Sequence, residues 1–158
     1  METETATRWL SDTEQCAWRT YLDVNRLLTY QMEKDLQPFG LTMNDYEILV
    51  NLSESADRRM RMSDLAAATL QSKSRLSHQI TRMENAGLVR RENCESDRRG
   101  LYAVLTDHGI HTMQKVAPHH VESVRQHFIG LLSPEALADL SEALKPVADH
   151  LRGRRGKV

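Results

Sequence analysis

Apolar residues recur every three or four positions along most of the chain, which predicts a mainly α-helical protein. The first stripe follows Ser11 and Glu14, which have the spacing of a capping box, and it stops before Pro38 and Gly40. A second helix is expected to begin after Thr42, which can cap it. The apolar positions of these two helices are Tyr21, Leu22, Leu28, Met32 and Leu36, then Tyr46, Leu49, Val50 and Leu52.

The stretch 70–86, LQSKSRLSHQITRMENA, places two different faces on one short helix. Ser63 is expected to cap a shorter helix that precedes this one, and a turn at 71–72 separates the two helices. The second helix is expected to stop at Gly87, because glycine readily adopts the left-handed conformation that ends many helices. Helical spacing separates an apolar set from a basic set: Leu76, Ile80 and Met83 against Arg75, His78 and Arg82. Two helices joined by a tight turn, the second with a basic face, are typical of a helix-turn-helix.

Beyond Gly87 the pattern changes to two short runs rich in β-forming residues. LVRREN (88–93) and LYAVLT (101–106) are separated by the charged connection CESDRRG, which predicts a β-hairpin with a long polar tip. The polar stretch 53–61 is expected to be a loop. The sequence therefore adds a wing to the helix-turn-helix.

Two further helices are predicted after the hairpin. Thr106 caps the first, which is expected to extend through Leu132, with Pro118 interrupting and kinking it. Ser133 followed by Pro134 is a strong start signal for the last helix. Its apolar residues are spaced like a heptad seam: Leu137, Leu140, Leu144, Val147 and Leu151.

These elements predict a mainly α fold with a small β-hairpin wing, that is, a winged helix-turn-helix flanked by N- and C-terminal helices. The expected divisions are an N-terminal helix in 1–40, the winged domain in 41–106, C-terminal helices in 107–152 and a frayed basic tail in 153–158.

Composition restricts the class of protein. The chain has 158 residues, 40% of them hydrophobic and 27% charged, which is ordinary for a folded, non-membrane protein. No apolar run approaches the roughly 20 residues that a membrane span needs. The polar, acidic start lacks the pattern of a secretory signal, and two cysteines cannot form a disulfide framework. We therefore expect a cytoplasmic protein with no membrane partner.

Charge is distributed unevenly along the chain. Residues 58–99 contain ten Lys or Arg and five Asp or Glu, a local net charge of +5, although the whole chain has a net charge of −1. A basic middle segment on a winged helix predicts binding of double-stranded DNA, with short polar side chains reaching base edges and a wing arginine entering the minor groove. The candidate DNA-contacting residues are Ser72, Lys73, Ser74, Arg75, Ser77, His78, Arg82, Arg90, Asp97, Arg98 and Arg99.

The segments SDLAAATLQSKSRLSHQITRMENAGLVRRE and SDRRGLYAVLTDHG resemble the MarR family of bacterial transcriptional regulators. The family's wing signature is Asp-x-Arg, an aliphatic strand, Leu-Thr and a following glycine, matched here by Asp97, Arg99, Leu105, Thr106 and Gly109. The resemblance covers about residues 11–151. It implies an obligate homodimer joined by the first and last two helices, a pseudo-palindromic operator, and Arg99 as the minor-groove arginine beside Asp97.

The last helix and the first have little domain left to pack on, so we expect their apolar stripes to pack between chains. The candidate dimerisation residues are Tyr21, Leu137, Leu140, Leu144, Val147 and Leu151. The resemblance also implies a small-molecule pocket between the winged domain and the dimer helices, and a repressor relieved by its ligand. Its candidate lining suits a small aromatic effector: Tyr21, Met32, Met43, Tyr46 and His111.

Several alternatives stay open. The seven histidines, and relatives of the family that respond to zinc, allow a metal-responsive regulator. His108 and His111 are three residues apart on one predicted helix, but Cys16 and Cys94 have no CxxC or HxxxH partner. Cys16, near the start of the first helix, allows redox sensing. A winged domain used only for protein contacts is a third alternative. No enzyme is expected, because GxSxG, P-loop, GxGxxG and HExxH motifs are all missing, and no cofactor is expected.

Overall fold

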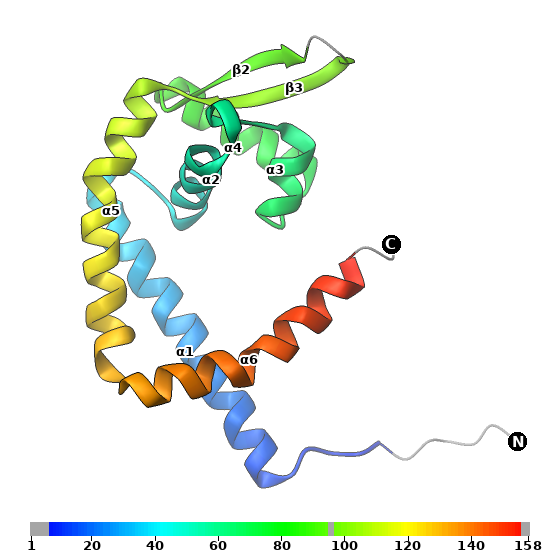
Figure 1. Cartoon of the computed structure of the whole chain (residues 1–158), viewed down its shortest axis with the longest axis vertical. Helices are drawn as coiled ribbons and strands as arrows, with labels where there is room; N and C mark the ends of the chain where they lie inside the picture. The colour runs from blue at the N-terminus through cyan, green and yellow to red at the C-terminus, as the bar shows by residue number, and fades with distance from the viewer. Residues whose placement is uncertain (1–6, 95–96, 156–158) are drawn as a thin grey trace, which may run out of the picture.

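The structure, a computed structural model, describes residues 7–94 and 97–155, with side chains described for all of these except 97–99 and 155. Figure 1 shows a compact winged domain attached to a frame of long helices. The helices are α1 (Asp12–Leu36), α2 (Met43–Glu54), α3 (Met62–Ala68), α4 (Lys73–Asn85), α5 (Asp107–His127) and α6 (Pro134–Arg155). The strands are β1 (Arg59–Arg61), β2 (Val89–Cys94) and β3 (Asp97–Leu105), and short 3₁₀ turns occupy Gln37–Phe39, Ala56–Arg58 and Ile129–Leu131.

The core lies mainly within the winged domain, and Leu36 of α1 and Val116 of α5 complete it. The buried faces of α2, α3 and α4 pack together and against one side of the sheet, and α5 begins beside them. The largest fully buried side chains include Leu36, Ile48, Leu49, Leu52, Leu65, Leu76, Ile80, Met83, Val89 and Val116. The predicted fold class, mainly α with a small wing, is confirmed.

Outside this domain, α1 and α5 run side by side and α6 leaves at a steep angle to α5 (Figure 1). The two paired helices are joined near their C-terminal ends by the Ser123 hydroxyl, which donates to Asp35 and lies 3.6 Å from the sulfur of Met32. The far half of α1 and most of α6 remain exposed. The frame therefore presents surface that the winged domain does not cover.

Local signals read from the sequence set most helix boundaries. Ser11 and Thr42 both form complete capping boxes, with Glu14 and Asp45. Thr106 caps α5 by accepting from the amide of Gly109. Gly87 has φ +72°, a left-handed conformation that costs glycine little, and it ends α4 as predicted.

The predicted loop at 53–61 is partly wrong, because it contains β1. This strand pairs antiparallel with β3, placing Arg59 opposite Val104 and Arg61 opposite Tyr102, so the sheet has three strands in the order β1-β3-β2. Both arginines lie over the ring of Tyr102, at 4.8 Å and 5.9 Å from its centroid. The wing is thus a hairpin extended by a short third strand.

Three helix boundaries also differ from the prediction. Ser63 does not cap α3. The helix begins at Met62, one residue before Ser63, and Arg61 at the cap position makes no capping hydrogen bond with its side chain. Helix α5 continues through Pro118 but ends at His127, since Phe128 leaves helical geometry with φ −142°. Helix α6 runs to Arg155, so the described part of the expected tail, residues 153–155, is helical.

Candidate nucleic-acid interface

Helix α4 separates its two faces as its sequence predicts. Leu76, Ile80 and Met83 are fully buried against the domain core. The residues at its start and on its outer face are exposed: Ser72, Lys73, Ser74, Arg75, Ser77 and His78. Ser72 caps the helix by accepting from the amide of Arg75 at 3.3 Å. The N-terminal half of α4 therefore presents short polar and basic side chains to solvent, beside a helix N-terminus that favours phosphate.

Helix α2 holds one side of α4 through a buried carboxylate. The side chain of Asp45 is 0% exposed and accepts hydrogen bonds from Arg82 and from Gln79, the latter at 3.0 Å. Burial acts to raise the pKa of Asp45, but hydrogen bonds from Arg82, Thr42 and Gln79 outweigh it, and the pKa lies below its ordinary value. Arg82, a candidate DNA-contacting residue, thus has a partner inside its own domain.

Strand β2 holds the other side of α4. The guanidinium of Arg91 donates to the Glu84 carboxylate at 2.6 Å, the Ser77 carbonyl at 2.8 Å and the Thr81 hydroxyl at 3.0 Å. The amide of Arg91 also donates to Glu84, at 3.0 Å. This set of contacts fixes α4 relative to the wing.

A basic cavity of about 380 Å³ lies between the start of α4 and the base of the wing. Lys73 and Ser77 from α4 line it together with Arg61 and Arg91, and Gly100 of β3 belongs to the same lining. Two of the candidate DNA-contacting residues are therefore gathered with two arginines outside the candidate set. Arg61 and Arg91 reach this cavity because they lie on strands β1 and β2. Arg61 is missing from the candidate set because the polar sequence of β1 predicts a loop.

The wing itself is described in part. Asp97, Arg98 and Arg99 belong to β3, with Asp97 paired to Cys94, but their side chains lie outside the described residues. Arg90 is exposed on β2, and its guanidinium contacts the Glu92 carboxylate at 2.6 Å. Arg90 is therefore available to solvent but held by an ion pair within the strand.

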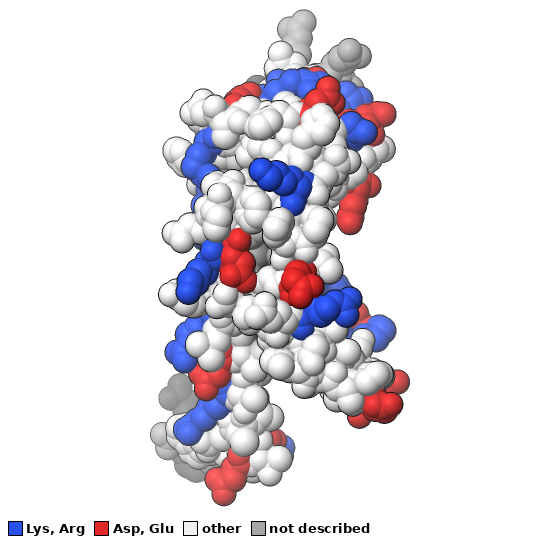
Figure 2. Space-filling view, turned by 90° about the vertical axis from the view of Figure 1, so that its left-hand side faces the viewer, with Lys and Arg blue, Asp and Glu red and all other residues white. Residues whose placement is uncertain are grey.

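The helical frame carries an exposed apolar surface. Trp18 and Tyr21 on α1 stack on each other with ring centroids 5.9 Å apart, and both are about half exposed. On α6, Leu137 and Leu140 are half-buried. The other large apolar side chains exposed on these helices include Leu22, Val24, Leu27, Tyr30, Leu144, Val147 and Leu151. Figure 2, which views the molecule from the α5 side, shows acidic and basic residues scattered among uncharged ones on that face.

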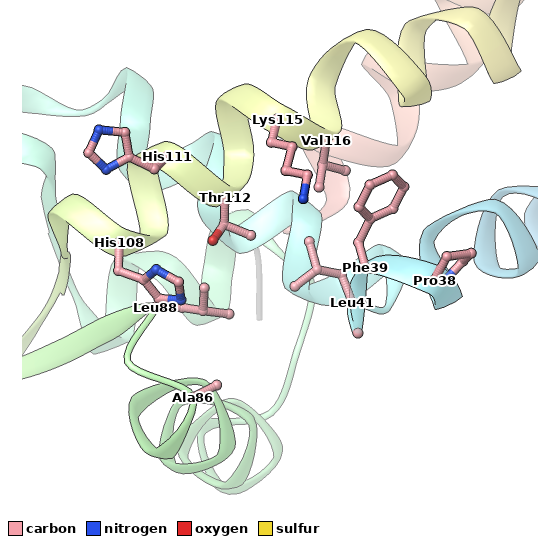
Figure 3. Close-up of a pocket in the computed structure, with 11 residues that line it drawn as sticks. Pro38, Phe39, Leu41, Ala86, Leu88, His108, His111, Thr112, Lys115 and Val116 are labelled. Carbon is pink, nitrogen blue, oxygen red and sulfur yellow. The ribbon is translucent and has the colours of Figure 1, made fainter.

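A cavity of about 570 Å³ lies where the winged domain meets the frame. Figure 3 shows Thr112 and Lys115 projecting from α5 toward Leu41 and Leu88. The rest of its lining comes from the α1–α2 connection, the end of α4 and α5: Pro38, Phe39, Gly40, Ala86, His108, His111 and Val116.

Of the five candidate pocket residues, His111 lines this cavity and the other four lie elsewhere. Met32 is buried against α5, and Tyr46 is buried against His120 with ring centroids 4.5 Å apart. Met43 packs at the edge of the core, and Tyr21 is exposed on α1. Met32, Met43 and Tyr46 are therefore used for packing, and Tyr21 lies on the exposed surface of α1.

The histidines and cysteines are dispersed. His119 packs on Phe39, and His127 lies 3.8 Å from Asp35. Cys16 is exposed and Cys94 is buried, and the two do not form a disulfide. Within residues 7–94 and 97–155, no three His, Cys, Asp or Glu side chains gather as a metal ion would require. Over the same residues, no helix is long and apolar enough to cross a membrane.

We compared the sequence and the fold with those of known proteins. A model of the MarR family matches residues 39–100. The fold is similar to that of AbsC, a MarR family transcriptional regulator from Streptomyces coelicolor, with a TM-score of 0.89 and 82% identity over 93% of this chain and 99% of that one. It is also similar to Sco3205 from Streptomyces coelicolor, a MarR family regulator solved in complex with DNA, with a TM-score of 0.88 and 42% identity over 93% and 92% of the two chains.

Among curated proteins, the HTH-type transcriptional regulator PecS of Dickeya dadantii is 29% identical over 133 residues, which are 84% of this chain and 80% of PecS. These relatives are transcriptional regulators and not enzymes. The similarity to AbsC spans nearly the whole of both chains. The chain belongs to the MarR family of transcriptional regulators.

Proposed function

We propose that the chain is a homodimeric regulator that binds specific sequences in double-stranded DNA, and that it is a repressor released by a small-molecule effector. The observation that carries the DNA-binding part is α4, whose apolar face is fully buried while its N-terminal half exposes polar and basic side chains. Such a helix fits the major groove of B-DNA. The DNA complex of Sco3205, 42% identical, supports the same use of the fold here.

The contacts divide by position. Ser74, Arg75, Ser77 and His78 lie on the exposed face near the start of α4, where side chains of a recognition helix reach base edges. Ser72 and Lys73 precede them and suit a phosphate. The basic cavity beside Lys73 extends this phosphate-binding surface toward the wing. Asp97, Arg98 and Arg99 remain our candidates for the minor-groove contact.

The dimer follows from the exposed apolar surface of α1 and α6. Soluble monomers rarely expose large contiguous apolar surface, so a second copy of the chain is the natural cover for these helices. A two-fold axis through this frame would hold two α4 helices for two half-sites about one DNA turn apart. Residues 1–40 and 107–152 would then form the dimerisation region, and 41–106 the DNA-binding domain. A role on chromosomal DNA would place the protein in the cytoplasm.

The effector site of this proposal is the cavity between the winged domain and the frame. Its apolar side chains Leu41, Leu88 and Val116 suit an aromatic ring, and Lys115 suits an anionic group on that ring. A ligand there would contact both parts of the molecule, so it could favour a relative orientation that does not fit the operator.

The experiment is enrichment of genomic DNA fragments by the purified protein, followed by sequencing and by titration of the enriched fragment and of random duplex. We expect an enriched pseudo-palindrome bound at least about 10³-fold more tightly than random duplex. No enrichment, with equal weak binding to both DNAs, would contradict sequence-specific binding. No binding to either DNA would favour a winged domain used for protein contacts.

A further inference from the structure

The carboxylate of Asp45 joins two parts of the winged domain with different tasks. One oxygen accepts from the backbone amide of Thr42 at 2.9 Å, within the capping box that begins α2. The other accepts from Gln79 at 3.0 Å and from the guanidinium of Arg82, both on α4. A single side chain therefore bonds the start of α2 to the middle of the recognition helix.

This carboxylate is costly to bury, which makes its partners important. Among the described residues, the buried polar side chains are Asp45, Thr69 and Ser123, so Asp45 is the one of them that carries a charge. A buried charge must be compensated by hydrogen bonds and by an opposite charge. The Asp45 site supplies both, but only when Gln79 and Arg82 face α2. The rotation and height of α4 are consequently tied to Asp45.

The start of α2 is in turn tied to the helical frame. The amide of Met43 donates to the Glu33 carboxylate of α1 at 3.1 Å, and Gly40 and Leu41 just before it line the cavity at the junction. The chain of contacts therefore runs from α1, through the α1–α2 connection and Asp45, to α4.

We propose that Arg82 is a positioning residue rather than a phosphate contact, and that its pair with Asp45 fixes the recognition helix relative to the dimer frame. This inference rests on the proposed DNA-binding function, and it states which contacts orient the DNA-binding helix α4. Gln79 contributes a second hydrogen bond from α4 to the same Asp45 carboxylate. Operator recognition then depends on Asp45, although this residue is buried and cannot touch DNA.

The test compares Asp45→Asn, Arg82→Met and the double variant with the wild type. Dissociation constants are measured on the enriched operator and on random duplex at several salt concentrations. Glu47→Gln is the matched control, because it removes the same charge from an exposed position on the same helix. Far-UV circular dichroism and thermal melting show which variants are folded.

We expect each single variant to lose about tenfold or more in operator affinity, comparable with the loss of a base contact, and to change by less than about twofold on random duplex. The double variant should be no weaker than the worse single variant, because both break one device. The salt dependence should keep its slope, and Glu47→Gln should bind like the wild type.

A phosphate contact by Arg82 predicts the opposite pattern. Arg82→Met would then weaken binding to both DNAs alike and lower the salt slope by about 1. Asp45→Asn would leave affinity unchanged or raise it, because it removes a negative charge near DNA. Either result overturns the inference. If Asp45→Asn does not fold, Arg82→Met and the uncharged Gln79→Ala decide, and normal operator affinity in both overturns it. A wild type that binds no DNA would instead refute the proposed function.

Discussion

A Cβ atom on Gly109 would lie 2.1 Å from the carbonyl oxygen of Leu88, so the first turn of α5 rests directly on the turn that follows α4. Thr106 completes this junction. Its hydroxyl donates to the carbonyls of Gly87 and Leu88 at 2.6 Å and 3.0 Å, and it accepts from the amide of Gly109 at 2.9 Å. The threonine and glycine of the wing signature therefore have a structural role. They join the end of the recognition helix to the first turn of α5.

Gly109→Ala should lower the free energy of unfolding by about 1–3 kcal/mol, because the new methyl group must displace backbone. Urea titration and thermal melting measure the loss. Gly153→Ala, on α6, is the matched control, since a Cβ there meets nothing within 4 Å. It should raise helix stability by about 0.5–1 kcal/mol. Equal stability of the two variants would contradict this prediction, because it would show that the backbone at Leu88 can move away from the new methyl group at little cost.

Features that depend on nearby residues could be predicted from the sequence. The capping boxes of Ser11 and Thr42, and the left-handed Gly87, are local patterns, and the structure has all three. The periodicity of α4 separated buried Leu76 from exposed Arg75 because a helix surface repeats within a few residues.

Features that depend on distant partners could not be predicted. Strand β1 has only three residues, two of them arginine, and exists because Arg59 pairs with Val104 far along the chain. The partner of Arg82 is Asp45, 37 residues earlier, and no local pattern joins the two positions. The same aspartate also completes the capping box of Thr42. The cavity at the junction is lined by three separate segments of the chain, so the region that the resemblance implied identified only His111 among its residues.

Arg75→Ala should weaken operator binding by roughly 1–3 kcal/mol while leaving binding to random duplex nearly unchanged, since a base-edge contact discriminates between sequences. Arg75 is exposed in the first turn of α4, where it has the reach for such a contact. Titration of both DNAs at one salt concentration measures the difference. Arg125→Ala, an exposed arginine on α5, should change neither affinity. Equal losses on the two DNAs would instead make Arg75 a phosphate contact.

Leu140→Asp together with Leu144→Asp should give a monomer, or poorly soluble protein, with lost operator affinity, because a charge in an apolar interface stays unpaired. Light scattering gives the mass, and a gel shift gives the affinity. Ala138→Asp places the same charge on an exposed position across the helix and should leave a dimer. A folded monomer with full operator affinity would refute the dimer proposal.

Stability should fall in mildly acidic solution because of His120. Burial against Tyr46 lowers the pKa of His120 below its ordinary value of 6.5, so the folded state resists protonation. The unfolded state therefore binds more protons in this range, and the stability contribution is full above about pH 6.5 and is lost as pH falls through the lowered pKa. Urea unfolding at pH 8 and at pH 5.5 measures it. His120→Phe should reduce the difference, whereas His150→Gln, exposed on α6, should keep it.

Salicylate, an aromatic carboxylate, is the probe for the cavity between the winged domain and the frame. At millimolar concentration it should raise the melting temperature of the free protein and weaken operator binding, because a ligand shifts a protein toward the state that it binds better. Lys115→Met should diminish both effects, since Lys115 is the ammonium group that projects into the cavity (Figure 3). Lys145→Met removes an equivalent charge from α6, where Lys145 pairs with Asp149, and should preserve both effects.

The outcomes separate the site from its action. A raised melting temperature with unchanged operator affinity would mean that the ligand binds both orientations equally, so it could not release DNA. Release of DNA that persists in Lys115→Met would place the effector at another site. If salicylate changes neither quantity, an aromatic carboxylate is the wrong ligand class for this cavity. Specific binding of the dimer to its operator would survive that result, because it depends on α4 and the frame and not on the cavity.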